Sequence, residues 1–268
     1  MVALLYAPDS RGNRLERYWV GMRPDRSEYY VHLHCADEIA SQVRNVLRPL
    51  EVADCLRGQD VLEWTHRLSF SGPYTTLHRD LLELLTTVLT LPPVLELNLV
   101  LALDFHKVPP DLAAGRTDWG WTDTGRLVYR KYFKDSPAEQ RRAGGALADR
   151  LTDVVTTHPL YRDAETIIAV PGTEHDFGQR LAGGVAVRCQ KQLVTARRIA
   201  TNRIRPAKEG EQSEVSFDCS ELPKGATAIV VDDVYRSGRT MGRVALAAWS
   251  AGASNVVGLT ATRTMRRQ

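Results

Sequence analysis

From residue 126 to the end of the chain, short apolar runs alternate with longer segments of helical character. Residues 166–170, 226–231 and 255–260 are rich in branched side chains and too short for buried helices, so they predict buried strands. Strands that alternate with helices are joined by right-handed crossovers, which makes the strands parallel and covers both faces of the sheet. The sequence therefore predicts an α/β fold, a mostly parallel sheet flanked by helices, with ligands at the carboxyl ends of the strands.

The remaining elements of this half follow from caps and spacing. Ser136 is suited to cap a helix, because Pro137 follows it and Glu139 lies three residues past the cap. The expected helices are residues 137–157, 177–193 and 240–251, and residues 126–132 are expected to form a further strand.

The first 110 residues follow a less regular pattern. Residues 29–34 predict a strand, residues 36–50 predict a helix, and residues 78–91 predict a second helix that two prolines end. Residues 95–105 are mostly apolar and predict a buried strand. The stretch 108–124 is rich in Pro, Gly, Asp and Trp, which is typical of a linker or loop. We therefore expect a smaller α+β N-terminal region of unknown role at 1–124, followed by an α/β domain at 125–268.

Composition narrows the class of protein. The 268 residues include 35 Lys and Arg against 32 Asp and Glu, and this small excess gives no sign of a nucleic-acid or membrane partner. The four cysteines form no CxxC pair, so neither a disulfide framework nor a zinc ribbon is expected. The apolar N-terminus is too short for a signal peptide, and no apolar run reaches the ~20 residues of a membrane helix. The cytoplasm is the expected compartment.

The segment with the clearest chemistry is residues 228–240, AIVVDDVYRSGRT. Apolar residues predict the end of a buried strand, Asp232 and Asp233 follow where it leaves the sheet, and a polar loop leads into a helix. Free N–H groups at a helix N-terminus bind phosphate, and Gly238 lets the backbone approach an anion closely. The two acids suit sugar hydroxyls. The pattern predicts a ribose 5-phosphate site; the alternative is a strand that ends in two solvated acids.

This segment resembles the signature of the type I phosphoribosyltransferases, which bind phosphoribosyl pyrophosphate (PRPP). The resemblance implies that Asp232 and Asp233 are catalytic and hold the ribose 2′- and 3′-hydroxyls. Many members have a small residue and a Thr–Thr pair where this chain has Tyr-Arg-Ser. The residues expected to wrap the 5′-phosphate are Tyr235, Arg236, Ser237, Gly238, Arg239 and Thr240.

Two further segments have counterparts in that family. A loop that meets pyrophosphate corresponds to Pro171, Gly172 and Thr173, with Arg180 directed at the same anion; a routine strand-to-helix turn is the alternative. A hood loop that folds over PRPP corresponds to residues 195–225. We expect Arg198 to be the catalytic residue of this loop, and a solvated charged loop is the alternative. The basic residues that are candidates for neutralising pyrophosphate there are Arg197, Arg198, Arg203, Arg205 and Lys208.

Within the family, the chain is most similar to the competence-associated ComF proteins. The shared layout is a basic strand with Lys131, a long helix, a Val-Pro turn, a basic loop, the two acids and an early chain end after VVGLTATRT. ComF proteins usually carry an N-terminal CxxC zinc finger, which this chain lacks. His32, His34 and Cys35 do not replace it, because no fourth ligand stands at suitable spacing.

The resemblance implies a phosphoribosyltransferase, a pentosyl glycosyltransferase that moves ribose 5-phosphate from PRPP to a nucleobase-like nitrogen acceptor and releases pyrophosphate. Mg²⁺ is the implied cofactor and would arrive on PRPP, with no protein side chain as a direct metal ligand. The expected partners are PRPP and an unidentified acceptor base. Members of this family often form dimers, so a homodimer is possible. Two alternatives stay open: a non-catalytic PRPP- or nucleotide-binding regulatory protein, and a ComF-like accessory protein of DNA uptake.

Overall fold

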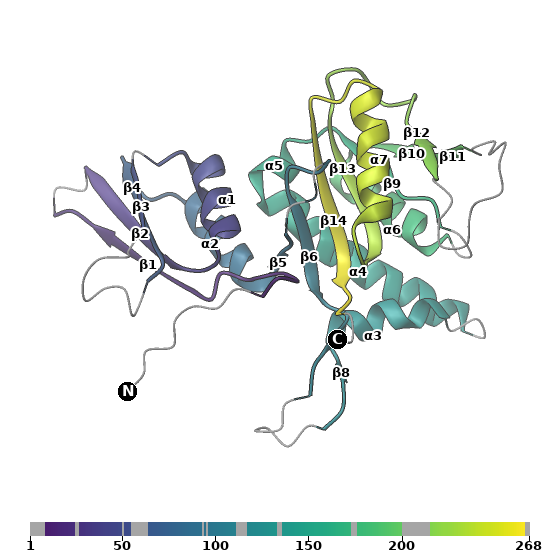
Figure 1. Cartoon of the computed structure of the whole chain (residues 1–268), viewed down its shortest axis with the longest axis horizontal. Coiled ribbons are helices and arrows are strands. Elements are labelled where there is room, and N and C mark those ends of the chain that lie inside the picture. The colour runs from purple at the N-terminus through teal and green to yellow at the C-terminus, as the bar shows by residue number, and fades with distance from the viewer. Residues whose placement is uncertain are drawn as a thin grey trace, which may run out of the picture. The chain divides into compact units, whose positions relative to one another are not determined.

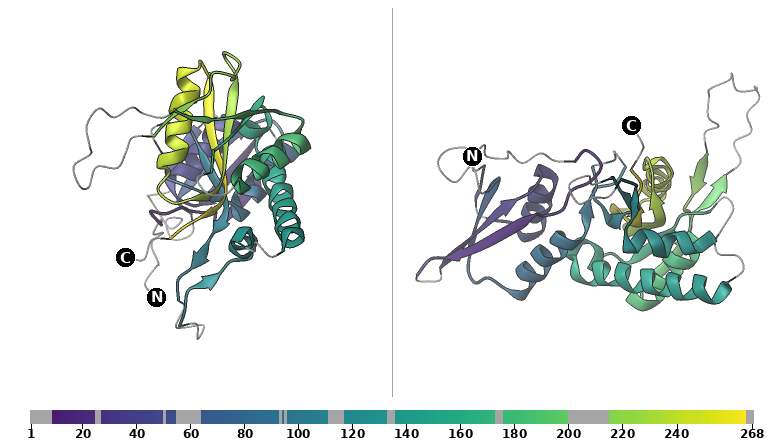
Figure 2. Two further views of the ribbon diagram at one scale, coloured as in Figure 1. Left: turned by 90° about the vertical axis from the view of Figure 1, so that its right-hand side faces the viewer. Right: turned by 90° about the horizontal axis from the view of Figure 1, so that it is seen from below.

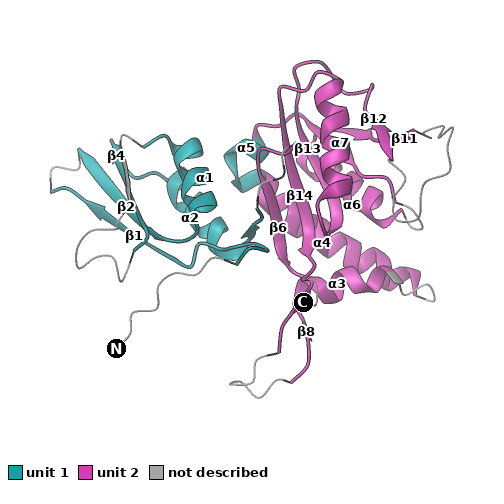
Figure 3. Cartoon of the chain, viewed as in Figure 1, with its two compact units in different colours: residues 1–92, 156–162 teal, residues 93–155, 163–268 magenta. Residues whose placement is uncertain are grey.

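The chain divides into two compact units (Figure 3). The computed structural model describes residues 9–24, 27–49, 51–54, 64–92, 94, 96–110, 117–132, 136–172, 176–199 and 215–265. Unit 1 comprises residues 1–92 and 156–162, and unit 2 comprises residues 93–155 and 163–268. This division differs from the boundary near residue 124 that the sequence suggested, because residues 100–105 form a strand of the unit 2 sheet.

Unit 1 is an antiparallel sheet in the order β1-β2-β4-β3 with two helices against it. The expected strand at 29–34 is confirmed, because β2 alternates with period two and buries Tyr29, Val31 and Leu33. The second expected helix ends at Thr87, since Val88 is already extended. The elements of unit 1 are β1 (Arg17–Met22), β2 (Glu28–His34), α1 (Asp37–Leu47), β3 (Glu51–Asp54), β4 (His66–Ser71), α2 (Thr76–Thr87), β5 (Leu89–Thr90) and α5 (Pro159–Arg162).

Unit 2 is built on a parallel sheet in the order β10-β9-β13-β14-β6 (Figure 1). Helix α7 covers one face, and α4 and α6 lie on the other, as the left view of Figure 2 shows. The central strands are almost wholly apolar because both faces are covered. These strands are β6 (Val100–Phe105), β9 (Thr166–Ala169), β10 (Gln192–Thr195), β13 (Thr227–Tyr235) and β14 (Asn255–Arg263). The α/β fold predicted from the alternation is confirmed.

The helices and small pairs of unit 2 complete the connections. Helix α4 begins at Pro137, as the cap signals predicted. The helices are α3 (Asp123–Tyr129), the 3₁₀ helix η2 (Arg130–Tyr132), α4 (Pro137–Thr157), α6 (Phe177–Cys189) and α7 (Arg239–Ser250). The antiparallel pairs are β7 (Lys107–Val108) with β8 (Gly120–Trp121), and β11 (Arg197–Ile199) with β12 (Ser216–Asp218). Along the described residues, no helix has both the length and the apolar character that crossing a bilayer requires.

Two sequence predictions for unit 2 are corrected. The strand expected at residues 126–132 is wrong, because this segment is helical in α3 and η2. The Thr122 hydroxyl accepts the Gly125 N–H at 2.9 Å and so caps α3. The strand expected at residues 226–231 continues as β13 to Tyr235, because β14 pairs with it as far as Arg263. Asp232 and Asp233 therefore lie within the last four residues of the strand rather than after its end.

Candidate functional site

The candidate site lies at the carboxyl end of β13, where Asp232 and Asp233 follow four buried apolar residues. Asp232 stands opposite Thr260 of β14, and its Oδ1 accepts the Asp233 backbone N–H at 2.8 Å. Burial, and then the neighbouring Asp233 carboxylate, raise the pKa of the Asp232 carboxyl to about 8. Ionisation of the Asp232 carboxyl is therefore unfavourable at this position.

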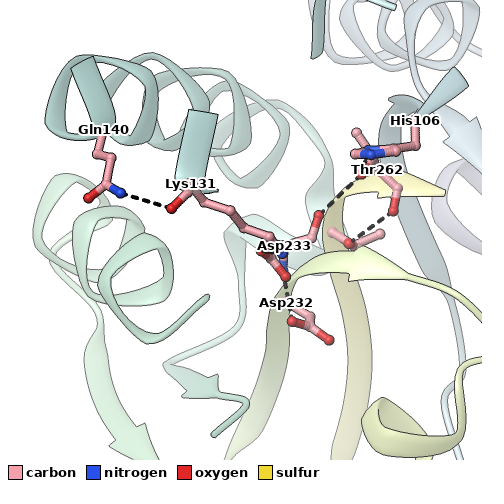
Figure 4. Close-up of polar contacts among 7 residues, drawn as sticks. His106, Lys131, Gln140, Asp232, Asp233 and Thr262 are labelled. Carbon is pink, nitrogen blue, oxygen red and sulfur yellow. Dashed lines mark hydrogen bonds and ion pairs between the residues drawn. The ribbon is translucent and has the colours of Figure 1, made fainter. Parts of the chain in front are cut away.

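Lys131 reaches the same pair from η2 (Figure 4). Its Nζ donates to Asp233 Oδ2 at 2.6 Å, across 102 residues of sequence. Both side chains are largely buried, with 14% of Lys131 and 13% of Asp233 exposed, so the pair is shielded from solvent. The Gln140 side chain of α4 donates to the Lys131 carbonyl at 2.8 Å and holds η2 in place. The sequence marked Lys131 as basic but assigned it no contact with the acids.

His106 is a site residue that the sequence analysis missed. It follows β6, its backbone N–H donates to the Arg263 carbonyl at 2.8 Å, and its Nδ1 lies 3.2 Å from Thr262 Oγ1. The Thr262 hydroxyl in turn donates to the Asp233 carbonyl at 3.4 Å (Figure 4). The available signal was a polar residue at the end of an apolar strand. Placing β6 in the N-terminal region hid that signal, because the strand was not expected beside β14.

The loop after β13 is three residues long and ends at the N-terminus of α7. Gly238 has φ 75°, and a Cβ built on it would lie 2.3 Å from the Tyr235 hydroxyl, so only glycine fits. Tyr235 itself is buried in the strand, and the Arg263 guanidinium lies 5.1 Å from its ring centre. Arg263 also donates to the Arg236 carbonyl, which fixes the loop from beneath.

The side chains of this loop face outward. The exposed members of the predicted phosphate loop are Arg236, Ser237, Arg239 and Thr240, whereas Gly238 and Tyr235 are buried. In the described structure, no side chain caps α7, so its first N–H groups are available to an anion. The predicted loop therefore presents exposed polar side chains and an uncapped helix N-terminus, with Tyr235 buried beneath it.

The loop expected to meet pyrophosphate is only partly covered by the described residues. Pro171 and Gly172 follow β9 at the same edge of the sheet, and Thr173 lies outside the described residues. Arg180 in the first turn of α6 pairs with Asp176, the residue just before this helix, at 3.3 Å. The first turn of α6 approaches the acids, since a Cβ on Gly178 would lie 3.4 Å from Asp232 Oδ1. A helix N-terminus thus faces the acid pair as well.

The hood segment contributes no contact to this site among the described residues. Arg198 lies in β11, is exposed, and its side chain makes no hydrogen bond or ion pair with any described residue. Arg197 pairs with Glu221. Residues Arg203, Arg205 and Lys208 lie outside the described residues.

The histidines of β2 take part in packing. His32 lies between the rings of Trp19 and Trp64, with ring centres 5.4 and 5.8 Å away. His34 pairs with Glu16 at 3.3 Å. Within the described part of the chain, no three His, Cys, Asp or Glu side chains gather in a way that would hold a metal ion.

Fold and site together define a parallel α/β protein with paired acids and an open helix N-terminus at one strand end. No family model matches the chain, and no curated protein matches it. Solved structures are similar at low identity. A purine phosphoribosyltransferase from Pyrococcus horikoshii Ot3 has 16% identity and a TM-score of 0.33, covering 43% of this chain and 71% of that one.

Two more solved structures are similar in the same range. An orotate phosphoribosyltransferase from Aeropyrum pernix has 20% identity and a TM-score of 0.33, over 58% of this chain and 72% of that one. An adenine phosphoribosyltransferase from Leishmania tarentolae has 17% identity and a TM-score of 0.38, over 58% of this chain and 68% of that one.

Proposed function

We propose that unit 2 binds PRPP and transfers its ribose 5-phosphate group to a ring nitrogen of a nucleobase-like acceptor, releasing pyrophosphate. The observation that carries this proposal is the arrangement of Asp232 and Asp233 at the end of β13, three loop residues before the open N-terminus of α7. The acids accept hydrogen bonds from sugar hydroxyls, and the helix end attracts a phosphate. A sugar phosphate can bind the acid pair through its hydroxyls and the helix N-terminus through its phosphate.

Charge stabilisation is the chemistry that these residues supply. Cleavage of the bond between C1 and pyrophosphate leaves positive charge on the ribose, which the Asp232–Asp233 pair stabilises from the hydroxyl side. The Lys131 ammonium holds the Asp233 carboxylate in a fixed position, so little reorganisation is needed during the reaction. Arg236 and Arg239 add positive charge beside the 5′-phosphate.

Mg²⁺ fits this site as an ion carried by the ligand. The described donors are two carboxylates, and one of them is already paired with Lys131, which is too few for a cage made by the protein. Mg²⁺ prefers one or two carboxylates together with substrate phosphates. When bound on PRPP, it would neutralise the leaving pyrophosphate.

Titration calorimetry with PRPP and Mg²⁺ tests the proposal. The wild type should bind PRPP, and the double variant Asp232→Asn, Asp233→Asn should lose this binding. A matched control is Asp80→Asn, Glu83→Gln on the exposed side of α2, which also replaces two carboxyl groups with amides and should bind as the wild type does. Absence of magnesium-dependent affinity for PRPP and for ribose 5-phosphate would refute the proposal.

A turnover assay then separates the competing functions. Pyrophosphate release that depends on both PRPP and a base supports the transferase. PRPP binding without release against purine and pyrimidine bases would indicate a regulatory binding protein instead. Binding of DNA at low salt by a protein without affinity for PRPP would favour an accessory role in DNA uptake.

A further inference from the structure

The His106 ring is linked through the Thr262 hydroxyl to the Asp233 backbone carbonyl. The single hydroxyl proton of Thr262 is directed at the Asp233 carbonyl at 3.4 Å. The Thr262 oxygen is then left to accept at its other contact, 3.2 Å away, and on this ground we assign the His106 ring proton to Nδ1. With the proton on Nδ1, Nε2 is left as the basic nitrogen, and no described residue donates to it.

The surroundings of His106 suit a flat heterocycle. Its ring centre lies 5.0 Å from that of Trp121 in β8, and Trp121 lies 4.8 Å from Tyr129 in α3. The Lys107 ammonium lies 4.1 Å from the centre of the Trp121 ring. Tyr129 is 44% exposed, so part of this aromatic group is open to solvent. Aromatic side chains with a partly exposed face stack on planar ligands such as nucleobases.

Burial and nearby charges lower the pKa of His106 and keep its ring neutral, so that a ring nitrogen is available to accept a proton. Burial is the largest cause of its lowered pKa, followed by Lys131 of η2 and Lys107 of β7. Asp233 of β13 acts in the opposite direction, and Arg236 of the loop after β13 lowers the pKa further. The contacts through Thr262 place His106 beside the backbone of Asp233.

We infer that His106 Nε2 is the catalytic base that takes the proton from the acceptor, and that Trp121 and Tyr129 form the platform on which the acceptor ring lies. This inference rests on the proposed phosphoribosyl transfer. The acceptor is a planar nitrogen heterocycle that carries an N–H. Its nitrogen forms the new bond to ribose C1 as the bond from C1 to oxygen breaks, and the electron pair leaves with pyrophosphate. The N–H proton passes to His106 Nε2 and forms the imidazolium.

The central experiment compares PRPP binding with turnover in His106→Gln. Binding, measured by calorimetry with PRPP and Mg²⁺, should match the wild type, because His106 does not hold the ribose or phosphate. Pyrophosphate release, assayed with adenine, guanine, hypoxanthine and orotate, should fall by ~10²–10⁴-fold for the base that the wild type uses. Wild-type kcat should fall as pH is lowered through the His106 titration, the variant should lack that limb, and added imidazole should restore part of its rate.

Thr262 provides a second test that leaves the imidazole in place. In Thr262→Val, Nδ1 loses its acceptor and the tautomer is no longer fixed, so kcat should fall less than in His106→Gln, with PRPP affinity unchanged. Thr262→Ser keeps a hydroxyl and should restore the rate. His34→Gln on β2 of unit 1 is the matched histidine control and should leave kcat unchanged.

The outcomes separate this inference from the proposed function. Wild-type turnover and an unaltered pH profile in His106→Gln and Thr262→Val would overturn the role of His106 while leaving the transferase in place. If the wild type binds PRPP but releases no pyrophosphate from it with any of the four bases, the role of His106 is also overturned. If the wild type does not bind PRPP, the proposed function itself fails.

Discussion

At the scale of single residues, the Asp232 carboxyl lies where ionisation is unfavourable. Burial and the adjacent Asp233 raise its pKa to about 8, so in the folded protein it gives up its proton far less readily than in the unfolded chain. A group with a raised folded pKa stabilises the fold fully below its unfolded pKa, and this contribution is lost as pH rises towards the folded pKa. The site therefore decreases the stability of the fold at neutral and basic pH.

We predict that Asp232→Asn raises the free energy of unfolding at pH 8 by about 0.5–2 kcal/mol and abolishes PRPP binding, the usual opposition between stability and function at a ligand site. The gain should disappear near pH 4, where Asp232 is protonated in the folded state. Urea denaturation at several pH values measures it. A variant that is less stable than the wild type at pH 8 would mean that this carboxyl supports the fold.

At the scale of elements, the unit formed by β13, the loop and α7 depends on one backbone conformation. Gly238 lies in the left-handed region with its Cα against the Tyr235 ring. We predict that Gly238→Ala destabilises the protein by more than about 1 kcal/mol and weakens PRPP binding, because the new methyl group forces the loop to move. Thermal denaturation and calorimetry measure the two effects.

Gly145 in α4 is the matched control for this substitution. It lies inside a helix with open space around its Cα, so Gly145→Ala should stabilise the protein by roughly 0.5–1 kcal/mol and leave binding unchanged. Equal effects of the two alanines on binding would contradict the role given to the loop.

The elements also show what the sequence can and cannot predict. Strand β9 and helix α4 were predicted nearly to the residue, because apolar runs and cap residues are local signals. Helix α3 was missed, since its cap, Thr122, fell in a stretch interpreted as a linker. The roles of Lys131 and His106 depend on contacts with β13 and β14 that are more than 100 residues away. No local pattern contains that information.

At the scale of the whole molecule, unit 1 is completed by residues 156–162 from the middle of the unit 2 sequence. Thr90 donates to Gln42 Oε1 at 3.2 Å, and the Gln42 amide contacts His158 Nε2 at 3.1 Å. All three side chains are buried. Because the Gln42 oxygen accepts from Thr90, the Gln42 amide nitrogen donates to His158 Nε2. This ring nitrogen therefore carries no proton.

This buried histidine predicts sensitivity to acid. Burial lowers the pKa of His158 to about 3, so below pH 6.5 the unfolded chain binds a proton that the folded protein does not. The free energy of unfolding should therefore fall by up to about 1.4 kcal/mol for each pH unit below that point. His158→Gln keeps a hydrogen-bond acceptor but does not titrate. As pH is lowered from 7 to 5, the free energy of unfolding of this variant should therefore rise relative to that of the wild type. A constant difference between the two proteins would show that His158 is not the titrating group.

The discontinuous unit also determines how the chain can be cut. A fragment of residues 93–268 retains the proposed PRPP site but loses the partners of residues 156–162, so the fully buried Tyr161 and His158 become exposed. We predict that this fragment has a lower melting temperature and binds a dye specific for exposed apolar surface, because uncovering one such side chain costs ~1.5–3 kcal/mol. Tyr161→Ser should make the fragment more soluble and the full chain less stable. If Tyr161→Ser fails to lower the stability of the full chain, or fails to raise the solubility of the fragment, residues 156–162 do not belong to the core of unit 1.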